Sequence, residues 1–222
     1  MMDTQALRKD AARNRDLLIS AGRDLFARRG LAATLNDVAH HAGVGVGTAY
    51  RRFANKEELI EAIWQQQVDE LEAILREAVA APDPWEGLVQ YLEKSLAAQA
   101  KDRGMAQMLA GRTWPDHYDQ QRDRLAPLVD QVADRARGAG ALREDVTGTD
   151  LIFLQIALTD ISGTVQSGSA PEGRDDADRL YRRYLWIVLD GLRASASAPS
   201  KLPVAALTTH ETHALLQPRP QG

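Results

Sequence analysis

The chain has 222 residues, of which 44% are hydrophobic and 26% are charged, a composition typical of a globular protein and not of a disordered one. It contains no cysteine, which excludes disulfide frameworks, thiolate zinc sites and cysteine nucleophiles. Its formal net charge of −4, taken alone, argues against a nucleic-acid partner.

The charge is distributed unevenly along the sequence. Residues 1–60 hold ten Lys or Arg and seven Asp or Glu, whereas residues 61–222 hold 17 basic and 24 acidic residues. A weakly basic N-terminal part followed by an acidic remainder indicates that only the N-terminal part binds phosphate. No apolar run resembles a signal peptide or reaches the ~18 residues of a transmembrane helix, so we expect a cytoplasmic protein with no membrane partner.

The first part of the chain predicts short helices with clear boundaries. Residues 1–12 are polar and are expected to form a flexible lead. Apolar residues then recur at spacings of three and four over residues 13–30, which predicts a helix. Thr34 with Asp37 three residues later resembles a capping box and predicts a second, short helix, which Gly43 ends.

The remainder also has helical periodicity, and no strand pattern or internal repeat is found. The further helices are expected over residues 46–53, 56–81, 85–103, 105–112, 116–137, 149–165 and 175–196. Pro127 lies inside one of them and predicts a kink. Residues 197–222, rich in Pro, Ser and Thr, are expected to form a disordered tail. The sequence therefore predicts an all-α fold of about nine helices.

Residues 34–53 carry the pattern that is most specific for a function. Two short helices meet at Gly43, where a tight turn requires a left-handed backbone that glycine adopts at little cost. A small core that fixes the angle between these helices is available from four apolar residues: Val38, Val44, Ala49 and Phe53. Such a helix-turn-helix places its second helix in a DNA major groove.

The second of these helices has a surface suited to DNA. Thr48 and Tyr50 offer hydroxyls to phosphate oxygens. Arg51 and Arg52 offer forked donors for phosphates or a guanine edge. The residues expected to contact DNA are Asn36, Gly45, Val46, Gly47, Thr48, Tyr50, Arg51, Arg52 and Lys56.

Several stretches in this region resemble the TetR/AcrR family of bacterial regulators. They are Phe26-Ala27-Arg28-Arg29-Gly30, Asp37-Val38-Ala39, Gly43-Val44 and the run from Gly47 to Leu59. The sequence departs from the family at Ala49, where a larger aliphatic residue is usual. The resemblance implies a DNA-binding domain over residues 13–60 and an effector-binding and dimerisation domain over residues 61–196.

The resemblance also implies a mechanism. Family proteins are homodimers whose last two long helices, here residues 149–165 and 175–196, form a four-helix bundle with their mates. They bind a small molecule in the C-terminal domain, and the fourth helix relays that event to the DNA-binding heads. We therefore expect a repressor that a hydrophobic or amphipathic ligand releases from a palindromic double-stranded operator.

The ligand-lining residues are not separable from ordinary core residues in the sequence. Pockets of this kind are mostly apolar with a few placed polar groups. The candidates chosen on that basis are Trp64, Trp85, Tyr91, Met105, Met108, Trp114, His117, Phe153, Gln155 and Asp160.

Other functions were weighed against a ligand-released repressor. A ligand-independent regulator or an activator would have the same sequence pattern. The glycines at 43, 45 and 47 lack the last glycine of a nucleotide-binding loop, and His210 and His213 lack the spacing of a zinc protease, so no cofactor, metal or enzyme is predicted. A non-specific nucleoid protein is disfavoured because its binding to DNA depends on many phosphate contacts, which the acidic residues 61–222 do not offer.

Overall fold

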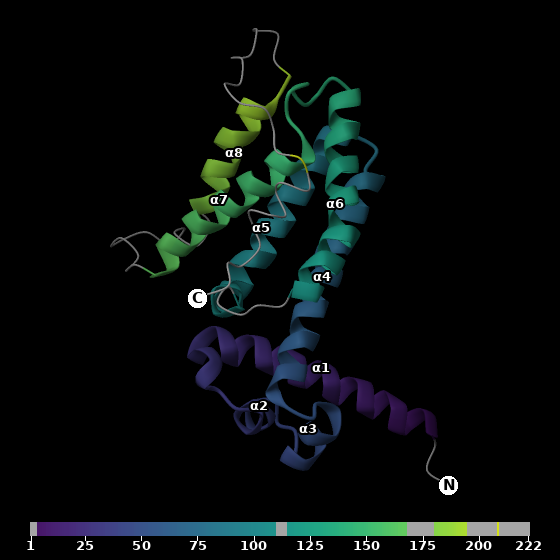
Figure 1. The fold of residues 1–222 in the computed structure, drawn as a ribbon, viewed down its shortest axis with the longest axis vertical. Helices are drawn as coiled ribbons and strands as arrows, with labels where there is room; N and C mark the ends of the chain where they lie inside the picture. The colour runs from purple at the N-terminus through teal and green to yellow at the C-terminus, as the bar shows by residue number, and fades with distance from the viewer. Residues whose placement is uncertain (1–3, 110–114, 168–179, 195–207, 209–222) are drawn as a thin grey trace. The chain divides into compact units, whose positions relative to one another are not determined.

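A computed structural model describes residues 4–109, 115–167, 180–194 and 208 (Figure 1). Within these residues the chain forms helices and no strand, which confirms the all-α prediction. The elements are α1 (Thr4–Arg29), the 3-10 turn η1 (Gly30–Ala32), α2 (Leu35–His41), α3 (Val46–Arg52), α4 (Lys56–Ala80), α5 (Pro84–Leu109), α6 (Pro115–Gly138), α7 (Gly148–Ser167) and α8 (Leu180–Leu192).

The chain divides into two compact units. The head comprises Met1–Asp69 and Asp102–Arg112, and the body comprises Glu70–Lys101 and Thr113–Gly222. Helix α4 therefore contributes its first half to the head and its second half to the body.

The first helix begins earlier than the sequence predicted. It starts at Thr4, so a helix start at residue 13 is wrong. Residues 5–12 are mostly Ala, Leu, Arg, Lys and Gln, which are strong helix formers, and glycine and proline are absent from them. The predicted stop is confirmed, because Gly30 has a φ of +63°.

The helices expected over residues 85–103 and 105–112 are one continuous helix, α5. A lone glycine at 104 costs about 1 kcal/mol relative to alanine but removes no backbone hydrogen bond, so it does not end the helix. Because these two expected helices are one, the described residues hold eight α-helices where about nine were expected.

The last helix ends at Leu192, and its expected start at residues 175–179 lies outside the described residues. The tail over residues 197–222 also lies outside them, apart from Thr208.

The head packs α1, α2, α3 and the start of α4 around one apolar cluster. Phe26, Val38, Ala49 and Leu59 come from these four helices, and each is 0% exposed. The absence of a side chain at Gly22 lets α1 and α4 approach closely, because a Cβ there would lie 2.9 Å from the Cδ1 of Ile63, in α4. The first turns of α4 are thus fixed to the two short helices.

In the body, α7 packs against both α6 and α8 (Figure 1). The end of α8 is fastened to the α6–α7 connection by two backbone hydrogen bonds. Arg143 N donates to Leu192 O at 3.0 Å, and Ala194 N donates to Ala141 O at 3.0 Å. Next to them, the Arg193 guanidinium lies 4.3 Å from the centre of the Trp85 ring, an attractive cation–π distance.

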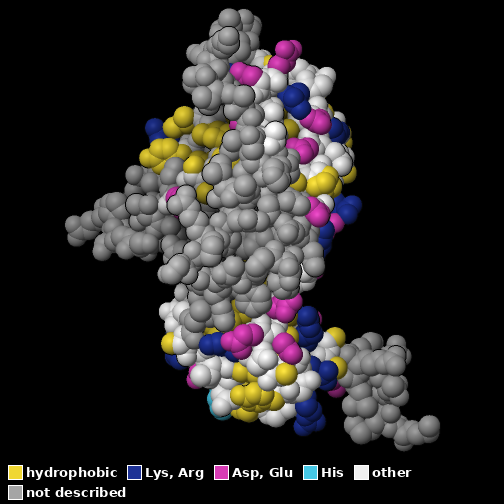
Figure 2. Space-filling view, viewed as in Figure 1, with side chains coloured by type: hydrophobic (Ala, Val, Ile, Leu, Met, Phe, Trp, Pro, Cys, Tyr) yellow, Lys and Arg dark blue, Asp and Glu magenta, His cyan; other side chains and the backbone are white. Residues whose placement is uncertain are grey.

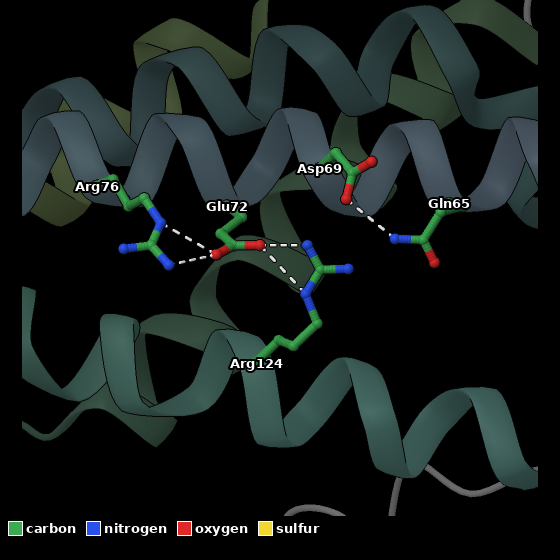
Figure 3. A network of polar contacts seen from close by, with 5 residues as sticks. All are labelled: Gln65, Asp69, Glu72, Arg76 and Arg124. Atoms are coloured by element: carbon green, nitrogen blue, oxygen red, sulfur yellow. Dashed lines mark hydrogen bonds and ion pairs between the residues drawn. The ribbon is translucent and has the colours of Figure 1, made fainter.

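An ion-pair network joins α4 to α6 in the body (Figure 3). The Glu72 carboxylate accepts a hydrogen bond from the Arg124 Nε of α6 at 3.1 Å. It also accepts one from the Arg76 Nη2 of its own helix at 2.6 Å. Glu72 is largely shielded from solvent, with 17% of its side chain exposed, so this pair is less screened than a fully exposed one.

A second link between the same helices lies at the end of α4. The Arg135 guanidinium of α6 donates to the carbonyl oxygens of Ala78 (3.3 Å), Val79 and Ala81 (2.8 Å). Carbonyls in the last turn of a helix have no partner within the helix, so a cation that binds them caps that helix. The second half of α4 is therefore held to α6 at two points.

Replacing Glu72 with Gln tests the first of these links. Hydrogen bonds from Arg124 and then Arg76 hold the pKa of the Glu72 carboxyl below its usual 4.5. Such a group stabilises the folded chain above pH 4.5, and its contribution disappears as the pH falls through the lowered pKa. We expect Glu72→Gln to lower the melting temperature at pH 7, by a margin that narrows below pH 4.5.

The matched control is Glu144→Gln, which removes an exposed carboxyl from the α6–α7 connection. Thermal unfolding followed by circular dichroism measures both variants against the parent chain. A Glu72→Gln margin that is the same at pH 7 and below pH 4.5 would show that the network contributes nothing through its charge.

Candidate nucleic-acid interface

The start of α2 is set by a reciprocal pair of hydrogen bonds. Asp37 N donates to the Thr34 Oγ1 at 3.2 Å, and Thr34 N donates to the Asp37 Oδ2 at 2.8 Å. This is the capping box that the sequence predicted. The hydrogen bonds from the Thr34 side chain and backbone lower the pKa of the Asp37 carboxyl, which favours the negative charge that stabilises a helix N-terminus.

The turn between α2 and α3 confirms the role expected of Gly43. Its φ is +65°, in the left-handed region that favours glycine. The chain is closed around it by Gly43 N donating to His40 O at 3.2 Å and Val44 N donating to Ala39 O at 2.9 Å. The turn therefore fixes the direction in which α3 leaves α2.

Helix α3 presents one face to the head core and the other to solvent. Ala49 is 0% exposed, and Phe53, directly after the helix, is 4% exposed. With 3.6 residues per turn, Arg51 lies on the side opposite Ala49, and Tyr50 and Arg52 flank it. The side chain of Tyr50 is half exposed at 50%, which is unusual for a large aromatic residue. The exposed face is thus aromatic and basic.

A hydrogen bond within α3 positions one of its arginines. Arg51 Nε donates to the carbonyl oxygen of Gly47 at 3.2 Å. A guanidinium has five N–H donors, so this bond restrains Arg51 and leaves its terminal donors for a nucleic acid. Gly47 itself has no heavy atom within 4 Å of where a Cβ would stand, so the backbone there is open to a close partner.

The start of α4 is fixed by its own cap. Glu58 N donates to the Asn55 Oδ1 at 2.9 Å, and Ala54 N donates to the Glu58 Oε2 at 2.7 Å. Lys56, the first residue of α4, is half-buried beside this cap. Only three residues separate it from the end of α3, so its position relative to the exposed face of α3 is set locally.

All nine residues predicted to contact DNA lie in the head, and none is buried. Six are exposed and three are half-buried. The exposed ones are Asn36, Gly45, Gly47, Tyr50, Arg51 and Arg52, and the half-buried ones are Val46, Thr48 and Lys56. Figure 2 shows Lys and Arg side chains on the face of the head that is in view. Contact of these nine residues with DNA remains a prediction.

Two interactions in the head have no signal in the sequence. The His41 Nε2 of α2 lies 2.7 Å from the Asp24 Oδ2 of α1, and the other carboxylate oxygen of Asp24, Oδ1, accepts a hydrogen bond from the Arg28 Nε at 2.8 Å. The Arg15 guanidinium lies 5.8 Å from the centre of the Phe53 ring. Both join residues that are far apart in sequence, where periodicity and local spacing carry no information.

In the body, the structure brings two of the predicted ligand-lining residues together. The Tyr91 hydroxyl of α5 donates to the Gln155 Oε1 of α7 at 2.7 Å, and both side chains are buried. Burial raises the pKa of the Tyr91 phenol, so the hydroxyl keeps its proton and remains a donor.

This pair belongs to a polar strip between α5 and α7. Tyr91, Ser95 and Gln99 are spaced by four and therefore share one face of α5. The Thr159 Oγ1 of α7 lies 2.7 Å from the Gln99 Oε1, and the Ser95 Oγ donates to the Leu92 carbonyl at 3.2 Å. The polar groups in this strip bond to one another and to the backbone, which is the condition for burying them at low cost.

The other ligand-lining candidates occupy different surroundings. Trp85 lies under Arg193, Phe153 is half-buried and Asp160 is exposed. Trp64 packs against the apolar cluster of the head. Trp114 and the side chains of Met105, Met108 and His117 lie outside the described residues.

Among the described residues, no three His, Asp or Glu side chains are grouped so as to hold a metal ion. Over that same part, no helix combines the length and the apolar character that crossing a membrane requires.

Two families match the chain. Residues 18–63 match the family described as bacterial regulatory proteins of the tetR family. Residues 83–194 match the family described as the C-terminal domain of SbtR-like transcriptional regulators. The first match spans the two short helices and the start of α4, and the second lies almost entirely in α5 to α8.

Individual relatives are similar over most of their length. The transcriptional repressor KstR2 of Rhodococcus jostii is 28% identical over 184 residues, which cover 79% of this chain and 89% of the relative. A crystal structure of a TetR transcriptional regulator from Streptomyces coelicolor is 31% identical with a TM-score of 0.63, and the match covers 82% of this chain and 99% of that one. The structure of the ketosteroid transcriptional regulator KstR2 of Mycobacterium tuberculosis is 26% identical with a TM-score of 0.59, over 82% of this chain and 95% of that one.

Proposed function

Because the chain belongs to the TetR family of bacterial regulators, we propose that it is a homodimeric repressor that a small ligand releases from a palindromic operator. The observation that carries the proposal is the exposed aromatic and basic face of α3, held by the turn at Gly43. Operator DNA in a bacterium lies in the cytoplasm, so the proposal places the protein there.

The contacts of α3 divide by their chemistry. Arg51, opposite the core, enters the major groove most deeply and takes the role of reading a guanine edge. Tyr50 and Arg52, on the two flanks, bind phosphates, and Lys56 holds the backbone beside them. Asn36 of α2 supplies a further contact to a base or to a phosphate. Phosphate contacts set the register of the head, and base contacts give the specificity.

Dimerisation is proposed to occur through α7 and α8. Ile156 of α7 and Tyr184 and Ile187 of α8 are 39%, 39% and 56% exposed. Tyr184 and Ile187 are three residues apart and share a face of α8. Figure 2 shows hydrophobic side chains gathered over α8. A two-fold pairing through this face removes them from water and holds two heads for half-sites about 34–36 Å apart.

The ligand is proposed to enter between α5 and α7, at Tyr91 and Gln155. A buried phenol and amide are the kind of placed polar groups that bind an apolar molecule bearing a carbonyl or hydroxyl group. In the structure the phenol donates to the amide oxygen. The relative KstR2 is described as a ketosteroid transcriptional regulator, which makes steroid ketones the first class of ligand to test.

Release follows from a difference in affinity. A ligand that binds a dimer whose heads are incorrectly spaced for the operator lowers operator affinity by linkage. Moving the population almost completely needs a difference of about 5.5 kcal/mol between the two states. Helix α4 is the proposed relay, since Glu72 and its last turn are bound to α6 while its first turns belong to the head core.

Operator binding is tested with a labelled DNA fragment from upstream of the gene, in moderate salt and with excess unrelated DNA. We expect tight binding that Arg51→Ala/Arg52→Ala abolishes, because the variant loses the base contact of Arg51, worth about 1–3 kcal/mol of discrimination, and the phosphate contact of Arg52. Electrophoretic mobility shift measures the affinity for the fragment and for the unrelated DNA.

The matched control is Lys94→Ala/Arg183→Ala, which removes two positive charges from α5 and α8 in the body. It should bind the fragment as the parent chain does. Equal losses in both double variants would mean that net charge and not α3 governs binding. Failure to bind this fragment and any member of a random DNA library would refute the repressor function.

Release by a ligand is tested by adding a steroid diketone to the preformed complex of the protein with the labelled DNA fragment. Tyr91→Phe removes the phenol donor and keeps the ring, so we expect release to need about tenfold more ligand, the equivalent of one hydrogen bond. Fluorescence anisotropy of the labelled fragment measures release.

Glu144→Gln, at an exposed position of the α6–α7 connection, is the control and should leave the ligand requirement unchanged. Release that is insensitive to Tyr91→Phe would place the ligand elsewhere. Specific binding that no steroid ketone or amphipathic compound reverses would favour a ligand-independent regulator.

A further inference from the structure

Helix α1 is longer than its packing in the head requires. It has 26 residues, and its first buried residue in the described part is Leu18. None of residues 10–17 is buried. The backbone of the helix from Thr4 to Leu17 extends about 21 Å at 1.5 Å per residue, and residues 10–17 contribute nothing to the apolar core.

This part of α1 carries a positive charge. Residues 4–17 contain four basic residues, Arg8, Lys9, Arg13 and Arg15, against two acidic ones, Asp10 and Asp16. Arg13 and Arg15 are exposed. An isolated helix of this length is marginal in water, so a projecting charged helix gains from a partner that stabilises it. Its charge makes a polyanion the complementary partner.

One contact shows where the projecting helix leaves the head. The Arg15 guanidinium lies 5.8 Å from the ring centre of Phe53, which directly follows α3. Arg15 therefore lies next to the C-terminal end of the helix whose exposed face carries Arg51 and Arg52. Figure 1 shows the N-terminal end of α1 extending away from α2 and α3. Basic residues from two separate elements thus meet at one end of α3.

We propose that residues 4–15 of α1 form a second DNA-binding element, which binds backbone phosphates beyond those that α3 reaches. The element strengthens binding without reading sequence, because phosphates are the same at every base pair. This inference rests on the proposed function, since α3 must dock in the major groove for α1 to reach the flanking backbone.

Charge variants within α1 test the inference. Lys9→Gln/Arg13→Gln removes two positive charges and keeps good helix formers. Each phosphate contact contributes about 0.9 to the slope of log affinity against log salt. We expect this variant to have a shallower slope, and roughly tenfold weaker operator binding per lost contact at 0.1 M salt. Its affinity for unrelated DNA should fall by the same factor, so the specificity ratio stays constant.

The matched variant is Asp10→Asn/Asp16→Asn, which removes negative charges from the same part of the helix. It should bind operator more tightly than the parent chain. Hydroxyl-radical footprinting should show the flanking protection shrink in the lysine–arginine variant and persist in the aspartate variant. Circular dichroism of both variants checks that α1 keeps its helix.

The outcomes separate this inference from the proposed function. Specific binding by the parent chain with unchanged slope and footprint in both α1 variants would overturn the inference alone. A parent chain that binds no DNA specifically would overturn the proposed function and the inference with it. A fall in the specificity ratio of Lys9→Gln/Arg13→Gln would mean that α1 reads bases, which contradicts a phosphate-binding role.

Discussion

At Gly43 the chain passes through a left-handed turn, and the buried side chains on either side of it fix α3 against α2. Val38 and Ala49 are both fully buried there, and side chains in a close-packed core leave few voids. If this turn relaxed, the exposed arginines of α3 would remain on the surface but would lose the common direction that a major groove requires. The capping box at Thr34 and the cap at Asn55 stabilise the helices that enter and leave this turn.

The body depends on a different kind of constraint, which is polar and long-range. Tyr91 and Gln155 join α5 to α7, and Glu72 and Arg124 join α4 to α6. A buried polar pair is costly when one partner is lost, so the ligand proposed to compete for Tyr91 would strongly affect how α5 and α7 pack. Because the first turns of α4 belong to the core of the head, α4 connects the body covalently to the residues that we propose to bind DNA.

The features that the sequence predicted well are those encoded within a few residues. The capping box, the turn at Gly43 and the start of α4 each need only neighbouring side chains, and all three are confirmed. The polar composition of residues 1–12 predicts a flexible lead, but α1 starts at Thr4 because residues 5–12 are mostly strong helix formers. Contacts such as Tyr91 with Gln155, 64 residues apart, have no local signal. Residue type alone also does not distinguish Trp64, which packs against the apolar cluster of the head, from the aromatic residues of the body.

The most direct test of the central claim is selection of bound sequences from a random DNA library by the full-length chain. A dimer that places two α3 helices in successive major grooves should enrich a palindrome whose half-site centres lie about 10–10.5 base pairs, or a multiple of that, apart. Enrichment of such a palindrome would establish both base reading and two-fold assembly. Recovery of a single half-site, or of no common sequence, would contradict the claim that this chain recognises an operator as a dimer.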